Sequence, residues 1–158
     1  MLMEKFTNFI TKTRARYDDA VWFLFRIAVS AMFITHGYGK LLGENPQSLS
    51  GSGMMSINIG ELISISMPFD INALFLAGSV ELVGGFLILI GLWTNIVALI
   101  AAFTMLMAYL IAHLAWFPTL NNGELAAMYF FSFLVLYCKD PGNLSIDSWL
   151  KSRKEANA

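Results

Sequence analysis

The sequence predicts an all-α integral membrane protein: a four-helix bundle with short amphipathic helices at the membrane interface. Three observations support this prediction. Hydrophobic residues make up 57% of the 158-residue chain, only 13% are charged, and four apolar runs are close to span length. A soluble domain carries about 25% charged residues, and a helix needs roughly 20 apolar residues to cross a bilayer core. We therefore expect a single membrane domain.

The first 19 residues predict a cytoplasmic amphipathic helix that lies on the membrane surface. A frayed basic leader is the alternative. We do not expect a cleaved signal peptide, because the segment is amphipathic and runs into a span that contains Arg26 without a small-residue cleavage pattern between them. The face that would enter the interface is apolar, and basic residues flank it. The residues of this face are Phe6, Phe9, Ile10, Thr13 and Tyr17.

The four spans are predicted at residues 20–42, 71–93, 96–117 and 124–140. Because backbone amides cannot stay unpaired in lipid, each span must be helical, and the short links make neighbouring spans antiparallel. Lys and Arg precede the first span and follow the fourth, but the loops between spans 1 and 2 and between spans 3 and 4 contain neither. This bias predicts cytoplasmic termini, including a tail over residues 141–158.

The external loop, residues 43–70, changes character along its length. Its first part is turn-forming, whereas residues 57–69 become apolar again around Gly60 and Glu61. That segment is too short and interrupted to cross the membrane. We expect it to form a short interfacial helix that caps the outer mouth of the bundle.

Six ionisable residues lie in or beside the apolar runs, where a charge costs about 2.5–3.5 kcal/mol on insertion scales. They are Arg26, His36, Lys40, Glu81, His113 and Glu124. Each therefore needs a partner, water or a function.

We predict a structural ion pair between Arg26 and Glu81. Small residues on either side of Glu81 allow close helix packing there, so its carboxylate should be buried. Counted at 1.5 Å per residue from the inner ends of the spans, Arg26 lies about 9 Å from Glu81 along the bundle axis. The two side chains can close that gap.

The remaining four residues, His36, Lys40, His113 and Glu124, predict a catalytic site near the outer leaflet. His36 and Lys40 lie one turn apart, His113 is at nearly the same depth, and Glu124 opens the fourth span. A polar cluster beside aromatic walls is typical of a quinone head-group site, where His or Lys donates to a carbonyl and a carboxylate relays protons. The expected aromatic walls are Tyr109, Trp116, Tyr129 and Phe130.

Other interpretations of the same residues stay open. The four could be a polar knot that holds the bundle together, and Lys40 could extend to the headgroups. His36 and His113 could ligate a haem or, with Glu124, a metal ion, although neither site has a specific sequence signature. One cysteine excludes an internal disulfide, and basic residues confined to the tails favour anionic lipid over nucleic acid.

The order of these signals resembles the DoxX family. The resemblance extends over roughly residues 26–147, and Lys139 departs from the expected turn residue. Its elements are Arg26, His36-Gly37-x-x-Lys40-Leu41, Glu81, Gly84-Gly85, Gly91-Leu92, His113, Asn122-Gly123-Glu124 and the closing segment 140–147.

The resemblance implies a four-span bacterial inner-membrane protein. The family is named for a subunit of a thiosulfate:quinone oxidoreductase, and other members are associated with redox-stress assemblies. We therefore expect a membrane subunit of a quinone-linked oxidoreductase that binds quinone or quinol, with a soluble or membrane redox partner. A non-catalytic anchor for a soluble redox partner is the alternative, and a small-solute carrier, without an evident inverted repeat, is a third. Small-residue faces permit a homodimer.

Overall fold

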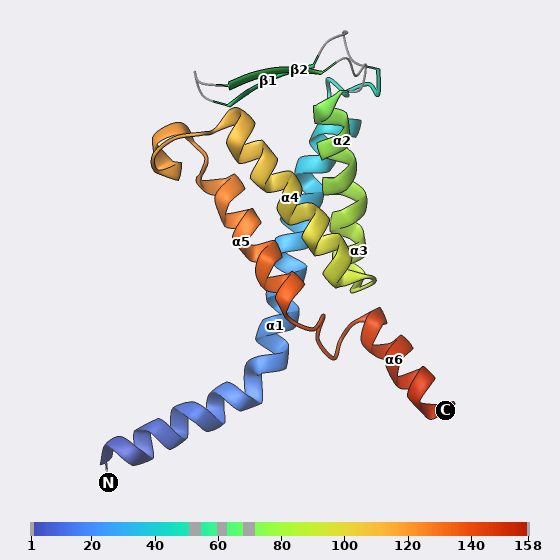
Figure 1. Cartoon of the computed structure of the whole chain (residues 1–158). Helices are drawn as coiled ribbons and strands as arrows, with labels where there is room; N and C mark the ends of the chain where they lie inside the picture. Colours follow the sequence, from blue (N-terminus) through green and yellow to red (C-terminus); the bar gives the residue numbers. More distant parts are fainter. Residues whose placement is uncertain (1, 51–54, 60–62, 68–71, 158) are drawn as a thin grey trace.

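The computed structural model describes residues 2–50, 55–59, 63–67 and 72–157. The described helices pack as an all-α bundle, and a short β-hairpin lies at one end of it (Figure 1). Both termini lie at the opposite end, which we call the termini end; the other is the hairpin end. The predicted fold class is confirmed. The elements are α1 (Leu2–Leu42), β1 (Met55–Ile59), β2 (Ile63–Met67), α2 (Ala73–Ser79), the π-helix η1 (Val80–Gly84), α3 (Gly85–Ile90), α4 (Thr94–Ala112), the 3₁₀-helix η2 (Pro118–Asn121), α5 (Glu124–Cys138) and α6 (Ile146–Ala156).

The N-terminal segment and the first span form one continuous helix, α1, of 41 residues. No Gly or Pro interrupts the sequence before Gly37, so nothing breaks the helix. Residues 2–21 are exposed and project away from the bundle at the termini end (Figure 1). Only the second half of α1 therefore packs in the bundle.

The second span consists of α2, η1 and α3 in succession. Asn72 caps its start by accepting a hydrogen bond from the Leu74 amide, and Gly91 ends it with a left-handed φ of 71°. The π-turn η1 lies between the two α-helical parts and contains Glu81. Such π-turns inside α-helices occur frequently at functional sites.

The third span ends earlier than predicted. α4 stops at Ala112, and His113 is its C-terminal cap. Phe117 is extended (φ −136°, ψ 138°), as the residue before a proline prefers to be, because Pro118 disfavours the helical conformation there. The side chains of residues 114–117 therefore belong to a connecting loop and not to a helix wall.

The predicted interfacial helix at residues 57–69 is wrong. The described part of this loop forms two antiparallel strands, β1 and β2, with Ile57 opposite Ile65. Both strands alternate Ile with polar residues, a period of two that favours a strand over a helix. Residues 60–62 and 68–69 of the predicted segment lie outside the described residues.

Membrane-spanning length is reached by α1, by the continuous stretch 73–90 and by α4 in the part of the chain that the structure describes. α5 has 15 residues, or about 22 Å of helix, which is less than the hydrocarbon thickness. Apolar side chains such as Leu24, Phe86 and Phe103 are exposed on these helices, as expected of residues that face lipid. The chain is thus membrane-embedded, and the fourth span stays a prediction.

Candidate functional site

Glycines set the register between α1 and the second span. A Cβ at Gly37 would lie 2.8 Å from the Gly78 carbonyl oxygen and 2.9 Å from the Glu81 carbonyl carbon. A Cβ at Gly78 would lie 3.0 Å from Cβ of Lys40. The two backbones approach this closely only because both positions lack a side chain. Lys40 therefore lies opposite the start of the π-turn.

Lys40 forms an ion pair with Glu81. Its ammonium donates to Glu81 Oε1, and the side chains of the two residues are 32% and 3% exposed respectively. The predicted Arg26–Glu81 pair is wrong, because the glycine contacts place Arg26 beside Gly91 instead. Gly91 follows Glu81 by ten residues, a separation of about 15 Å along a helix.

Arg26 instead ties the segment after α5 to the bundle. Its Nη2 donates to the Leu144 carbonyl, and the residue is 1% exposed. Neither Nε nor Nη1 has a hydrogen-bond partner among the described residues. Arg26 thus holds together segments at the termini end, and it lies far from Lys40 along α1.

A cavity of about 280 Å³ opens beside the Lys40–Glu81 pair. It receives side chains from α1, η1, α4, α5 and the loop between α4 and α5. Four of the predicted site residues meet there, and Glu81 joins them. The lining residues are Phe33, His36, Lys40, Glu81, Met105, Ala108, His113, Asn122, Leu125, Ala126 and Tyr129.

Two buried polar atoms of lining residues lack hydrogen-bond partners among the described residues: Glu81 Oε2 and the Tyr129 hydroxyl. Burying such an atom unsatisfied costs about 1–3 kcal/mol, and more when the atom belongs to a charged group. Native structures seldom retain such atoms without a reason, so their presence in residues that line one cavity favours a polar ligand or water between them.

The two histidines occupy different positions around the cavity. His36 is exposed and packs its ring edge-on against Tyr129, with 5.8 Å between the ring centroids. His113 Nδ1 lies 3.0 Å from the Asn121 carbonyl oxygen. Because a carbonyl only accepts, Nδ1 must donate, which leaves Nε2 of the neutral ring as an acceptor.

Several predicted residues do not line the cavity. Glu124 is exposed at the start of α5, and the next two residues line the cavity in its place. Trp116 is 96% exposed in the loop that follows the early end of α4. Tyr109 donates to the Ala115 carbonyl at 3.1 Å, and Phe130 packs against the core. These residues are therefore assigned no direct part in the site.

The metal alternative lacks its carboxylate, since Glu124 is not among the lining residues that include His36 and His113. In the described ranges, no three His, Cys, Asp or Glu side chains gather as metal ligands. Sequence reasoning placed Glu81 in a structural pair and so missed it as a site residue. The spacing Gly37-x-x-Lys40 and Gly78-x-x-Glu81 is the signal that could have found it.

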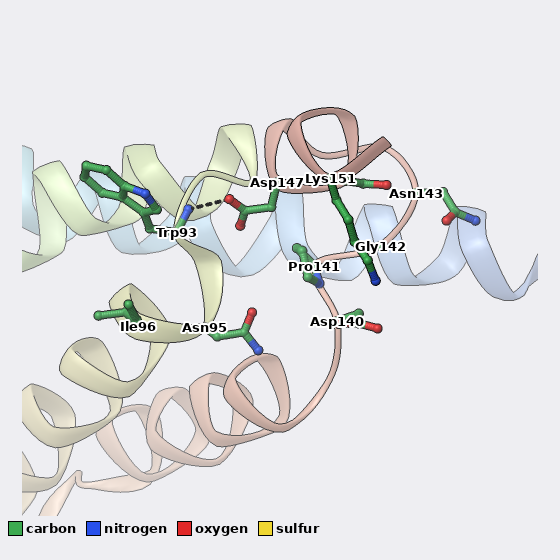
Figure 2. Close-up of a pocket in the computed structure, with 10 residues that line it drawn as sticks. Trp93, Asn95, Ile96, Asp140, Pro141, Gly142, Asn143, Asp147 and Lys151 are labelled. Atoms are coloured by element: carbon green, nitrogen blue, oxygen red, sulfur yellow. Dashed lines mark hydrogen bonds between the residues drawn. The ribbon is translucent and has the colours of Figure 1, made fainter. Parts of the chain in front are cut away.

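A second cavity, of about 410 Å³, lies at the termini end between α4 and the segment that leads into α6 (Figure 2). Asp147 there caps α4: its carboxylate accepts from the amides of Trp93 and Thr94, both at 2.9 Å, and from the Thr94 hydroxyl at 3.1 Å. Its own amide donates to the Gly91 carbonyl. The sequence did not predict this contact. Because the Asp147 carboxylate already accepts these three hydrogen bonds, we assign it a structural role.

Comparison with known proteins relates the chain to a protein family and to a bacterial protein. The DoxX family profile matches residues 21–114. A Haemophilus influenzae protein, named only as uncharacterized, is 34% identical over 128 residues, which cover 78% of this chain and 85% of the relative. No solved structure matches this chain significantly.

Proposed function

This chain belongs to the DoxX family, and we propose that it is a membrane subunit of a quinone-linked oxidoreductase that binds a quinone or quinol head group. The observation that carries the proposal is the cavity that joins His36, His113, Tyr129 and the Lys40–Glu81 pair within membrane helices. Charged and titratable groups at this depth are expensive, and they usually mark a functional site.

The cavity fits the head group but not the whole lipid. Its volume of about 280 Å³ is just below the ~300–1,000 Å³ range of typical small-molecule sites. Phe33, Met105 and Leu125 provide apolar wall, and the polar groups meet a ring's oxygens. An isoprenoid tail would extend out of the cavity into the surrounding lipid.

The residues of the cavity have the chemistry that such a head group needs. Lys40 and Tyr129 can donate to a ring oxygen, and His113 Nε2 can accept from one. Glu81, not Glu124, supplies the buried carboxylate of the cavity, and its oxygens can accept hydrogen bonds. A quinone, when bound, supplies two-electron, two-proton redox chemistry.

The orientation is part of the proposal. Lys and Arg are concentrated at the termini end, so we place that end at the cytoplasmic face of a bacterial inner membrane. The cavity includes His113 at the far end of α4 and therefore lies toward the outer leaflet. Labelling of single cysteines introduced near residue 5 and at Ser48, in intact cells and in inverted vesicles, tests this assignment.

Ligand extraction and titration test the function. We expect quinone to co-purify with the protein, and decylubiquinone to bind the protein in phosphatidylcholine nanodiscs, with empty nanodiscs as the blank. His36→Ala combined with His113→Ala should weaken binding at least tenfold, whereas Tyr38→Phe, on an exposed part of α1, should not. Unchanged binding by the double variant would contradict the proposal.

A non-catalytic anchor is the second candidate, and one observation favours it. The first 20 residues of α1 are exposed and project beyond the bundle, with Phe6 and Phe9 on their surface. If the anchor function is correct, deletion of residues 2–19 should abolish function in cells, and the histidine double variant should retain it. The quinone function predicts the reverse for the double variant.

A further inference from the structure

We propose that this cavity selects a head group that carries a hydrogen-bond donor, and so binds the reduced, hydroxyl-bearing quinol in preference to the quinone. The inference rests on the proposed function of the cavity and specifies its ligand. It concerns binding selectivity only.

The unpartnered oxygen of Glu81 requires a hydrogen-bond donor. Lys40 occupies Oε1, whereas Oε2 is buried and has no partner among the described residues. An ionised carboxylate is acceptor-only, so the group that satisfies Oε2 must donate. A quinone carbonyl cannot donate and would place one acceptor against another. A quinol hydroxyl donates to Oε2 directly.

Two other polar groups that line the cavity also suit a ligand with donors. His113 Nδ1 is committed to the Asn121 carbonyl, so Nε2 offers a second acceptor. The Tyr129 hydroxyl, also buried without a partner in the described part of the chain, can rotate to donate or accept. A 1,4-dihydroxy ring has two donors at opposite ends. It therefore has as many hydrogen-bond donors as the cavity has acceptors of this kind, and the Tyr129 hydroxyl can donate to or accept from a ring oxygen.

An ordered water is the competing occupant, because water also donates. Water bound to Glu81 Oε2, however, predicts no preference between a ligand with a ring hydroxyl and the same ligand with a methyl ether in its place. A matched pair of ligands therefore separates the two explanations without any redox chemistry. The pair is 4-hexylphenol and 4-hexylanisole, in which a methyl ether replaces the donor.

The experiment titrates each compound into the wild-type protein in nanodiscs by calorimetry, with empty nanodiscs correcting for partition into lipid. A hydrogen bond to a charged acceptor predicts that the phenol binds about tenfold or more tightly than the ether. Decylubiquinol, kept reduced under nitrogen, should likewise bind more tightly than decylubiquinone.

Glu81→Gln sharpens the test. The amide oxygen can still accept from Lys40, but an NH₂ donor replaces Oε2. The variant should therefore prefer ligands that accept hydrogen bonds. The affinity for decylubiquinone relative to that for decylubiquinol should be higher in the variant than in the wild type. Glu124→Gln is the matched control, because Glu124 is exposed and does not line the cavity. It should keep the wild-type preference.

The outcomes separate this inference from the proposed function. Equal binding of phenol and ether to the wild type overturns the donor selection, and the quinone function survives if decylubiquinone binds. If neither quinone nor quinol binds, both fail. The wild-type comparison decides the matter even if Glu81→Gln does not fold.

Discussion

Lys40 of α1 and Glu81 of the π-turn η1 pair across a helix contact in which Gly37 and Gly78 lie almost backbone to backbone. One carboxylate oxygen of Glu81 accepts a hydrogen bond from the Lys40 ammonium. The other oxygen is buried, in a residue that lines a cavity. The pair therefore belongs both to the bundle's architecture and to its candidate site. The role of the pair in stability and its role in the candidate site can be tested separately.

Breaking the pair from one side should be costly. Lys40→Met leaves the Glu81 carboxylate buried without its cation, and removal of one partner of a buried pair costs about 3–5 kcal/mol. We expect a clearly lower melting temperature of the variant in detergent, measured by intrinsic fluorescence. Adding Glu81→Gln to Lys40→Met should recover part of the loss. If Lys40→Met alone leaves the melting temperature unchanged, the Lys40–Glu81 ion pair does not stabilise the protein by this amount.

The Gly37 contact should not tolerate a methyl group. In Gly37→Ala the new Cβ would lie 2.8 Å from the Gly78 carbonyl oxygen, so α1 must move away from the second span. Overpacking of this kind costs about 1–3 kcal/mol. Gly39→Ala is the matched control, since nothing lies within 4 Å of a Cβ there. Melting temperatures of the two variants should therefore separate, with only Gly37→Ala lowered.

The Tyr129 hydroxyl should contribute to ligand binding but little to stability. It has no protein partner in the described residues, so Tyr129→Phe should leave the unfolding free energy unchanged or raise it by up to about 1–3 kcal/mol, the cost of burying an unsatisfied hydroxyl. Phe133→Ala, a fully buried neighbour in the core, should cost about 3–5 kcal/mol. A large destabilisation by Tyr129→Phe would reveal a partner for the hydroxyl and weaken its assignment to the ligand.

Asp147 should stabilise the start of α4. Asp147→Ala removes the acceptor for the amides of Trp93 and Thr94, and losing such a cap costs about 0.5–2 kcal/mol. Hydrogen exchange should rise at the first turn of α4, and quinone affinity should stay within twofold because the cavity lies toward the other end. Exposed Asp140, replaced by Ala, provides the comparison; equal effects of the two variants would contradict the capping role.

The sequence by itself determined the membrane character, the approximate position of three apolar spans, and four of the five titratable groups around the cavity. These features follow from local rules: apolar run length, charge placement and the cost of ionisable groups in lipid. His36, Lys40, His113 and Tyr129 were predicted together because three of them could be aligned by depth and the fourth lay in the adjoining aromatic wall. The alternation of apolar and polar residues in the two loop strands is also present in the sequence, although the apolar character of the segment predicted an interfacial helix.

Only the tertiary structure decided which charges meet. Depth counted from approximate span ends favoured Arg26 with Glu81, but the real register depends on where two backbones can touch, and Gly37 against Gly78 fixes it. The early end of α4 likewise took Trp116 out of the site, and the orientation of α5 left Glu124 outside the cavity. Register and rotation arise from packing between distant segments, whereas span length and polarity are properties of each segment alone.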